Sequence, residues 1–292
     1  MERQEWLDER KKGIGGSDIP AILGIDRFRT PLDVFLEKTN RSQTEDNKYM
    51  YAGRKLEPVI AEMFQDQTGY NVIIPDKQFY IHPENELFRA SIDRIYEYKN
   101  TINILECKST QLQVSEPQES HYVQLQWYLG VMNCEKGALA YLQHGLDFTH
   151  FEFDRKIDFI EYLQEEALNF WNKHILTDTP PEASNAADVL KLYHTHKDGK
   201  VYDATAEDYA RYELLTTTKR QIKALEEMEE QLKEEFQLKM LDAEMALYSG
   251  SPIVSWKSSI VNRFDTTAFK KSHPALYQEF TKQSEQRRFL VK

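Results

Sequence analysis

The spacing of apolar residues changes at Gly69, and this change constrains the fold more than any other feature of the sequence. Before it, between about residues 50 and 68, apolar side chains recur at helical spacing. Beyond it, segments rich in β-branched and aromatic residues have the composition of strands, at 72–74, 79–81, 88–98 and 102–108. The same patterns predict a helix at 117–132, strands at 138–142 and 148–153, and a helix at 157–175. The sequence therefore predicts a mixed α/β unit, with the strands of 72–108 arranged as a meander.

Two shorter helices are expected upstream of this unit. One begins at Ser17, a good N-cap residue, and ends at Gly24. The other opens at Pro31, because proline is favoured in the first turn of a helix. The charged stretch 40–48 is expected to be a loop.

Composition divides the chain into three regions. Residues 1–176 have the mixed pattern of a globular core, and 177–204, with two adjacent prolines, are expected to be a linker or short helix. The extension 205–292 differs: residues 205–245 hold 6 basic and 11 acidic side chains, whereas 250–292 hold 8 basic and 3 acidic. The acidic part predicts a long helix or a helical hairpin. In the basic part, 253–264 alternate like a β-hairpin and 287–291 resemble a last strand.

The whole-chain composition excludes several classes of protein. Two cysteines in 292 residues cannot form a disulfide framework or a four-thiolate zinc site, so a reducing cytoplasm is expected. No stretch approaches the roughly 20 apolar residues of a membrane span. The net charge of −11 argues against a protein that coats nucleic acid with its whole surface, so a DNA ligand would need a local basic groove. Gathered carboxylates are also what hard divalent cations require.

The segment around Glu106 is the most informative for chemistry. Residues two apart on a strand face the same side, so Glu106 and Lys108 project together while Leu105 and Cys107 face the other way. Asp93 lies thirteen residues earlier on the preceding strand, and a hairpin would bring it beside Glu106. Two carboxylates that hold Mg²⁺, with a lysine that steers or deprotonates water, suit phosphodiester hydrolysis. The same spacing also occurs on solvated faces of strands, so spacing alone leaves both readings open.

Five short motifs occur in order along the first 176 residues: RKKGIGGSDI at 10–19, GRKLEP at 53–58, SID at 91–93, LECK at 105–108 and YVQLQ at 122–126. Together they resemble the YqaJ-type viral recombinase family, which includes phage lambda exonuclease and belongs to the PD-(D/E)xK nuclease superfamily. The resemblance implies a restriction-endonuclease-like core, in which a mixed central sheet is flanked by helices. The C-terminal helical arm and small β-hairpin would then be an extension of that core.

The resemblance also implies the roles of site residues. It implies a catalytic set made of Glu57, Asp93, Glu106, Lys108 and Gln124. Asp93, Glu106, Glu57 and the Cys107 carbonyl would hold Mg²⁺, for which Mn²⁺ could substitute, and Lys108 would activate water. For Glu57 the alternative is a surface carboxylate on a helix, and Gln126 is expected to face away from Gln124 because residues two apart on a helix diverge.

Three further residues, Arg10, Ser17 and Ser91, match family positions that contact the 5′-phosphate end of DNA. A guanidinium grips phosphate bidentately, and a serine at a helix N-terminus offers a hydroxyl and backbone N–H groups. Ser17 could also simply cap its helix, and the Ser91 hydroxyl could be satisfied within the sheet. The chain departs from the superfamily pattern at Ile92, where proline is usual, and at Arg94, where the family often has glycine.

The resemblance implies a Mg²⁺-dependent deoxyribonuclease of phage or prophage origin that acts in the bacterial cytoplasm. It would digest one strand of duplex DNA from 5′ to 3′ and leave a 3′ single strand for an annealing protein, and it could form a homotrimeric ring. Two alternatives remain: a structure-specific endonuclease on the same core, or a non-catalytic module that binds DNA ends or recruits a recombinase. In the extension, Trp256, Lys257 and Arg263 could contact DNA, or Trp256 could be the core of a packed hairpin.

Overall fold

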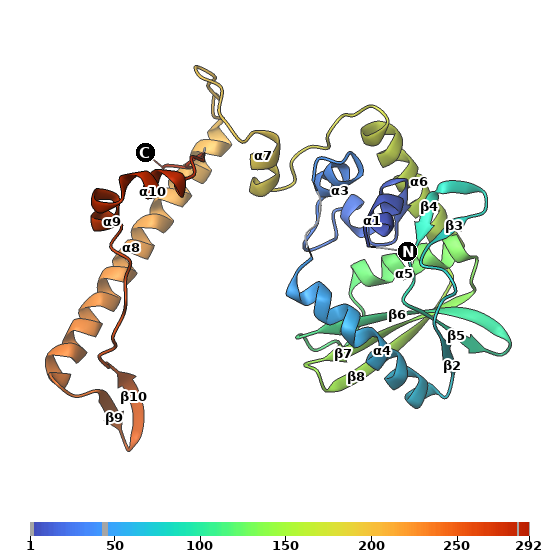
Figure 1. The fold of residues 1–292 in the computed structure, drawn as a ribbon, viewed down its shortest axis with the longest axis horizontal. Coiled ribbons are helices and arrows are strands. Elements are labelled where there is room, and N and C mark those ends of the chain that lie inside the picture. The colour runs from blue at the N-terminus through green and yellow to red at the C-terminus, as the bar shows by residue number, and fades with distance from the viewer. Residues whose placement is uncertain (1–2, 43–45, 285, 292) are drawn as a thin grey trace. The chain divides into compact units, whose positions relative to one another are not determined.

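The change from helix to strand occurs at Gly69, as the sequence predicts (Figure 1). The structure is a computed structural model that describes residues 3–42, 46–284 and 286–291. Helix α4 (Lys48–Thr68) begins after Asn47, whose side chain accepts hydrogen bonds from the backbone N–H groups of the first turn. It ends at Gly69, whose φ of 73° is the left-handed conformation that glycine adopts without strain. Residues 43–45 of the expected loop at 40–48 lie outside the described residues.

A five-stranded mixed sheet forms the centre of the first unit. Its strands, in spatial order, are β2 (Asn71–Ile73), β5 (Arg94–Tyr98), β6 (Thr101–Thr110), β7 (Lys136–Gln143) and β8 (Asp147–Asp154). The β6–β7 pair is parallel and the other pairs are antiparallel. Lys99 and Asn100 join β5 to β6 with φ of 50° and 59°. Positive φ at both central residues is typical of the two-residue turns that match strand twist, and it fixes the register of this hairpin.

A second sheet separates segments that the sequence pattern joins. Its strands are β1 (Ile14–Gly15), β4 (Asn85–Ala90) and β3 (Tyr80–His82), with β4 in the middle. The expected continuous strand at 88–98 is therefore wrong, because the chain leaves one sheet after Ala90 and enters the other at Arg94. The expected meander is wrong for the same reason. Pairing of β4 with the distant β1 decides the break, and a local pattern cannot reveal it.

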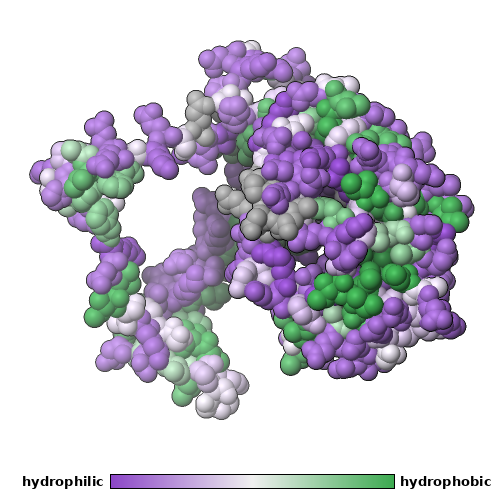
Figure 2. Space-filling model, turned by 45° about the vertical axis from the view of Figure 1, so that its right-hand side comes forward, coloured by the Kyte–Doolittle hydropathy of each residue, from purple (hydrophilic) through white to green (hydrophobic). Residues whose placement is uncertain are grey.

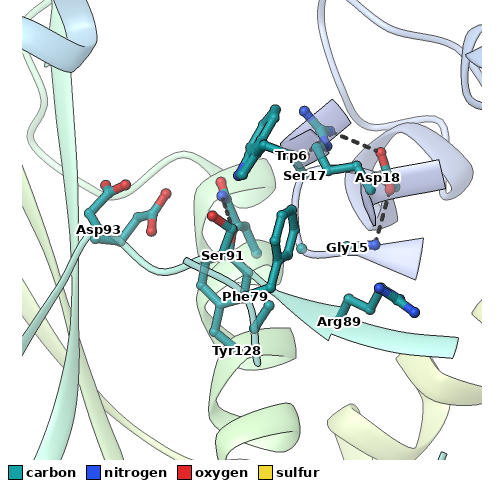
Figure 3. Close-up of a pocket in the computed structure, with 14 residues that line it drawn as sticks. Trp6, Gly15, Ser17, Asp18, Phe79, Arg89, Ser91, Asp93 and Tyr128 are labelled. Atoms are coloured by element: carbon teal, nitrogen blue, oxygen red, sulfur yellow. Dashed lines mark hydrogen bonds and ion pairs between the residues drawn. The ribbon is translucent and has the colours of Figure 1, made fainter. Parts of the chain in front are cut away.

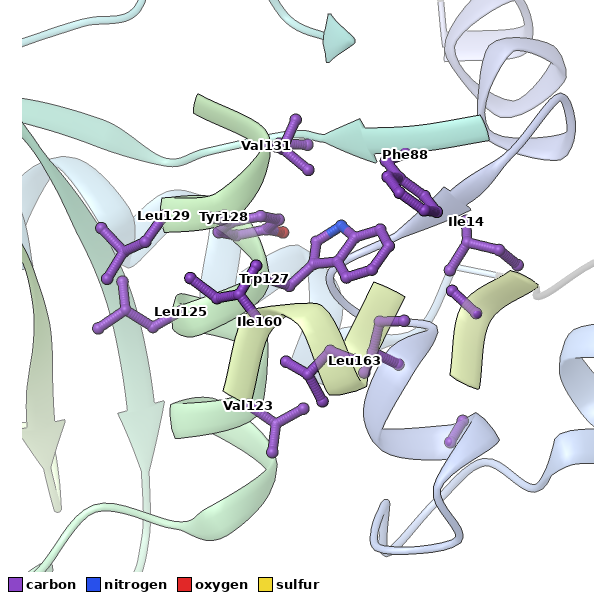
Figure 4. Close-up of a cluster of buried hydrophobic side chains, with 14 of the residues drawn as sticks. Ile14, Phe88, Val123, Leu125, Trp127, Tyr128, Leu129, Val131, Ile160 and Leu163 are labelled. Carbon is purple, nitrogen blue, oxygen red and sulfur yellow. The ribbon is translucent and has the colours of Figure 1, made fainter. Parts of the chain in front are cut away.

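Helices cover both faces of the central sheet. On one face, Ile60 and Phe64 of α4 pack with Leu105 and Ala140 of the sheet. On the other lie α5 (Glu119–Met132) and α6 (Ile157–Phe170), which surround a cluster centred on Trp127 (Figure 4). These layers confirm the expected α/β class, with a mixed central sheet flanked by helices.

Trp127 ties the second sheet to this core. Its indole N–H donates to the Arg89 carbonyl at 2.9 Å, and its ring meets Phe88 edge-to-face at 5.1 Å. Burying an aromatic side chain of this kind contributes about 1.5–3 kcal/mol. The small sheet and α5 are thereby fixed to each other.

The N-terminal helices differ in part from expectation. They are α1 (Arg3–Lys11), α2 (Ile19–Ile22) and α3 (Pro31–Lys38). The charged start of the chain gave no indication of α1. Asp18, not Ser17, is the N-cap residue of α2, so the expectation that Ser17 caps this helix is wrong. The start of α3 at Pro31 is confirmed, and a reciprocal capping box between Thr30 and Asp33 stabilises it.

The first unit runs from Met1 to Leu192. Helix α6 continues into a π-helical turn, η1 (Trp171–Ile175), and the segment expected as a linker contains α7 (Ala186–Leu192). Asp188 of α7 is fully buried and accepts hydrogen bonds from the Thr30 hydroxyl and the Ser184 N–H, both at 3.1 Å. These contacts attach α7 to α3.

The second unit runs from Tyr193 to Lys292. Its long helix α8 (Ala206–Met240) is continuous, so the alternative of a helical hairpin is wrong. The unit also contains β9 (Met245–Tyr248), β10 (Ser251–Ser255), α9 (Thr266–Ser272) and α10 (Pro274–Glu279). Apolar side chains of α8 such as Leu225, 64 % exposed, face solvent between charged ones, and Figure 2 shows hydrophobic residues interspersed with hydrophilic ones on the surface.

The β-hairpin of this unit lies earlier than expected. It is formed by 245–255 instead of 253–264, because Ser249 and Gly250, with φ of 52° and 81°, provide the turn. Residues 287–291 are not a strand. Trp256 is 45 % exposed, so it is not the core of a packed hairpin. Within the described ranges, no helix has both the length and the apolar character needed to cross a membrane.

Candidate active site

The β5–β6 hairpin brings Asp93 and Glu106 together. Arg94 pairs with Leu105, and this register sets Asp93 opposite Glu106. The backbone N–H of Cys107 donates to Asp93 Oδ2 at 2.9 Å. As the alternation predicts, Leu105 and Cys107 pack on the α4 side of the sheet, whereas Glu106, 3 % exposed, faces the other side. Two carboxylates from adjacent chain segments thus lie at one place.

Lys108 and Gln124 join the same place from a strand and a helix. Lys108 Nζ donates to Glu106 Oε1 at 2.8 Å and to Gln124 Oε1 at 2.9 Å. Gln124 in turn donates through Nε2 to the Tyr128 hydroxyl at 2.9 Å. Gln126 faces elsewhere, as expected: its side chain hydrogen-bonds the Asp154 carbonyl and the Lys156 N–H.

Glu57 approaches the two acids from α4. Its carboxyl hydrogen-bonds that of Asp93, and burial together with the Asp93 charge raises the pKa of Glu57 to about 8. Burial and the Asp93 charge also raise the pKa of Glu106 to about 7, against the opposing effect of Lys108. Glu57 therefore shares a crowded acidic site and is not a solvated helix carboxylate.

The charge of Lys108 depends on these acids. Burial alone would lower the pKa of Lys108, but the carboxylates of Glu106 and Asp93 outweigh that effect and raise it. The ammonium is accordingly held in its charged form by the negative charge beside it.

The donor set fits a hard divalent cation. Crowded carboxylate oxygens with raised pKa values are the ligands and the electrostatic environment that such an ion relieves. Glu106 Oε2 is buried and has no hydrogen-bond partner within the described part of the chain, so this oxygen can bind the cation. As the side chains stand, no three His, Cys, Asp or Glu groups of the described chain converge closely enough to hold a metal ion. Asp93 accepts a hydrogen bond from the Cys107 N–H, and Glu106 accepts one from Lys108.

A cavity of about 170 Å³ connects this acidic site to the N-terminal segment. Figure 3 shows Asp93 at one side of it and Ser17 at the other, with Ser91 between them. The cavity also reaches Arg10, Glu106 and Gln124. Its volume equals that of about six waters and is below the roughly 300–1,000 Å³ of organic-ligand pockets. It has room for a phosphate-sized group beside an ion.

The side of the cavity away from Asp93 is suited to an anion. Arg10 Nη2 donates to Ser17 Oγ at 2.9 Å, and its guanidinium lies 4.8 Å from the centroid of the Trp6 ring. The Ser17 hydroxyl lies in the turn before α2, next to the N-cap residue Asp18. Ser91 lines the cavity at the corner between β4 and β5.

Among the residues that line the cavity, sequence reasoning missed Trp6, Asp18, Phe79, Arg89 and Tyr128. Trp6 and Phe79 lie side by side, with ring centroids 5.6 Å apart. The spacing of Trp6 and Arg10, four residues apart, places them on one helix face and could have indicated Trp6. Phe79 comes from a distant segment, and no local signal identifies it.

Comparisons with known proteins show what the chain is similar to. The profile of the YqaJ-like viral recombinase domain matches residues 5–135. Among solved structures, an alkaline exonuclease (LHK-Exo) from Laribacter hongkongensis is 17 % identical and has a TM-score of 0.49, over 60 % of this chain and 93 % of that one. A phage-related exonuclease from Haemophilus somnus 129PT is 14 % identical and has a TM-score of 0.44, over 57 % and 96 %.

A relative of similar length decides the family. YqaJ of Bacillus subtilis (strain 168) is 33 % identical over 306 residues, which cover 100 % of this chain and 95 % of that protein. The five ordered motifs, the profile match and this full-length similarity agree, and the chain belongs to the YqaJ-like viral recombinase family.

Proposed function

We propose that the protein is a Mg²⁺-dependent exonuclease that digests one strand of duplex DNA from a 5′-phosphorylated end. The coarser assignment, a nuclease enzyme of the viral recombinase type, is supported by its family. The observation that carries the finer proposal is the cavity that joins Arg10 and Ser17 to Asp93 and Glu106. A group that grips a terminal phosphate next to a cleavage site defines an enzyme that starts from ends.

The acidic side chains perform the chemistry in this proposal. Asp93, Glu106 and Glu57, with the Cys107 carbonyl, would hold Mg²⁺, and Mn²⁺ would substitute for it. When bound, such an ion stabilises the negative charge that develops on the scissile phosphate and makes water a better nucleophile.

Lys108 is the water-activating group of the proposal. Its proton is held by the negative charge of Glu106 and Asp93, so neutralising that charge lowers the pKa of Lys108 toward the range of a general base. Gln124 accepts a hydrogen bond from Lys108 and is itself held by Tyr128, which fixes the direction of the amine.

At the other side of the cavity, Arg10 and Ser17 would bind the 5′-phosphate, and Ser91 would contact the strand near the scissile bond. The Arg10 guanidinium already donates a hydrogen bond to the Ser17 hydroxyl, so little ordering is needed when the anion binds. Binding of the end phosphate would place the next phosphodiester near the acids.

The proposal extends to the products and partners. Digestion from 5′ to 3′ leaves a 3′ single strand, which is the substrate of a single-strand annealing protein in phage recombination within a bacterial cell. The net charge of −11 provides little general attraction for DNA. Enclosure of the duplex by a homotrimer would supply the hold on DNA that the surface charge does not.

An assay with end-labelled DNA tests this function. Linear duplexes with a 5′-phosphate, linear duplexes with a 5′-hydroxyl and covalently closed circles are incubated with the protein and Mg²⁺. The proposal predicts mononucleotides from the phosphorylated ends, slower release from hydroxyl ends and intact circles. Cleavage of circles as fast as linear DNA would instead indicate an endonuclease. Intact DNA throughout, in Mg²⁺ and in Mn²⁺, would indicate a non-catalytic module.

A further inference from the structure

Asp18 is a buried carboxylate surrounded by three cations. Its side chain has no exposed surface. Lys38 Nζ lies 2.6 Å from Oδ2, Arg29 Nη2 lies 3.0 Å from Oδ1, and Arg10 Nη2 lies 3.5 Å from Oδ1. Burial alone would raise the pKa of Asp18, but these cations outweigh it and hold the pKa well below its usual range. Asp18 is therefore a permanent anion inside the protein.

The same carboxylate fixes the backbone that carries Ser17. The Gly15 N–H donates to Asp18 Oδ2 at 3.0 Å, and the Asp18 N–H donates to the Gly15 carbonyl at 2.9 Å. These reciprocal bonds close the turn from Gly15 to Asp18, and Figure 3 shows this turn beside the cavity. The position of the Ser17 hydroxyl thus depends on Asp18.

The three cations are not equivalent. Arg29 also donates to the Ser17 carbonyl at 2.9 Å, and Lys38 to the Arg10 carbonyl at 2.6 Å, and neither side chain lines the cavity. Arg10 lines the cavity and has the longest contact with Asp18. Two cations therefore neutralise the buried anion, while the third is oriented by it and directed to the cavity.

We propose that Asp18 is a positioning residue that gives the enzyme its preference for a 5′-phosphate end, because it holds Arg10 and the turn of Ser17 in the arrangement that receives the anion. This inference rests on the proposed function. Asp18 itself repels an anion, so its effect is exerted through Arg10 and Ser17.

Charge and geometry predict opposite results when the carboxylate is removed. Asp18→Asn makes the surroundings of the cavity more positive by one charge, and a purely electrostatic effect would strengthen binding of a phosphate. Loss of positioning would weaken it, because Arg10 and Ser17 would no longer be held together before the ligand arrives. The sign of the change therefore separates the two explanations.

The test compares kcat and KM on linear duplexes with a 5′-phosphate or a 5′-hydroxyl end, at one salt concentration in Mg²⁺. For Asp18→Asn we expect KM for phosphorylated ends to rise about tenfold, the effect of one lost charge-assisted hydrogen bond. The change in kcat should stay within about twofold, because the acids and Lys108 are untouched. The ratio of kcat/KM between the two ends should then fall by about the same tenfold.

Asp188→Asn is the matched control. Asp188 is also fully buried in the first unit and also contacts a lysine, Lys191 at 3.1 Å, but it does not line the cavity. A general loss of stability would affect both variants, whereas loss of positioning would reduce end preference only in Asp18→Asn. If Asp18→Asn alone does not fold, Asp18→Asn/Lys38→Met, which removes the anion with its nearest cation, is measured in the same way with the same expectation.

Two results would overturn the inference, and they have different meanings. A wild-type protein that treats both ends alike would contradict the proposed function and the inference together. A wild-type protein that prefers phosphorylated ends, with an unchanged or greater preference in the Asp18 variants, would overturn the inference alone.

Discussion

Lys108 and Gln124, sixteen residues apart in the chain, are joined by a hydrogen bond of 2.9 Å between the ammonium and the amide oxygen. Lys108 lies on β6, the strand that also carries Glu106, and Gln124 lies on α5, the helix that crosses over from β6 to β7. The helix that connects the parallel strands β6 and β7 therefore also supplies Gln124, which contacts Lys108 in the acidic site.

Lys108→Ala should abolish cleavage but leave DNA-end binding unchanged. Loss of a group that transfers a proton in the transition state lowers rates by about 10²–10⁴-fold. Release of mononucleotides and binding of a labelled end, measured separately, check this prediction. Lys99→Ala, in the β5–β6 turn, is the control. Cleavage by Lys108→Ala at a rate near that of the wild type would exclude Lys108 as the activating group.

Affinity for a divalent cation should increase with pH between 6 and 9. The pKa of Glu106 is raised to about 7 and that of Glu57 to about 8, so a cation must displace protons from these groups at lower pH. Each displaced proton weakens binding by about tenfold per pH unit below the pKa. Calorimetric titration with Mn²⁺ measures the affinity at each pH. In the wild type the affinity should stop rising above about pH 8, the raised pKa of Glu57, whereas in Glu57→Gln it should stop rising near pH 7, the pKa of Glu106.

The same pKa values determine stability without a cation. Both folded-state values lie above the ordinary value of 4.5, so the stability that these groups contribute is fully present below pH 4.5 and is lost as pH rises through about 7 and 8. The unfolding temperature in EDTA should therefore fall between pH 6 and 9, and Mg²⁺ should restore it. A pH-independent affinity together with a flat stability profile would contradict this account of the site.

Acid should destabilise the protein through His121. Burial and the neighbouring Lys108 lower the pKa of His121 to about 3, and its Nδ1 lies 3.0 Å from the Tyr141 hydroxyl. The unfolded chain takes up a proton below the ordinary pKa of 6.5, so stability falls as pH decreases from 6.5 toward 3. The loss is at most about 1.4 kcal/mol per pH unit.

Urea unfolding at several pH values tests the role of His121. His121→Gln, which stays neutral, should lose less stability than the wild type between pH 6.5 and 4. His144→Asn, at an exposed turn, is the control and should keep the slope of the wild type. Equal slopes in all three proteins would show that His121 is not held neutral.

Gly16→Ala should destabilise the first unit. A Cβ at this position would lie 2.3 Å from Tyr128 Cε1, so the ring that holds Gln124 must move. Overpacking of this kind costs about 1–3 kcal/mol. Gly53→Ala in α4 is the control: no described heavy atom lies within 4 Å of its added Cβ, so the change should stabilise the helix by about 0.5–1 kcal/mol. Denaturant unfolding that ranks the two variants in the opposite order would contradict the packing.

Local sequence patterns predicted the part of the site that lies within the β5–β6 hairpin. Alternation along β6 set Glu106 and Lys108 on one face, and a hairpin with a two-residue turn placed Asp93 opposite Glu106. Both follow from strand periodicity and turn chemistry over a few residues. Glu57 and Gln124 came from the family motifs, because nothing in their own helices distinguishes them from other polar residues.

The rest of the site depends on contacts between distant segments. The pairing of β1 with β4 divides the strands into two sheets and bends the chain at Ser91. It also brings the turn of Ser17 to the cavity, where Asp18 is held by Lys38 and Arg29 from α3 and the loop before it. Such contacts have no periodic signature in the sequence, and for this reason Asp18, Trp6 and Phe79 were not predicted.

The position of a bound cation tests the central claim most directly. Crystals soaked in Mn²⁺ and measured at an anomalous wavelength locate the ion without reference to activity. We predict an anomalous peak in contact with the carboxylates of Asp93 and Glu106, close to Glu57, and its loss in Asp93→Asn/Glu106→Gln. A peak elsewhere in the wild-type chain, with Lys108 still bound to Glu106 there, that persists in the double variant would contradict the account.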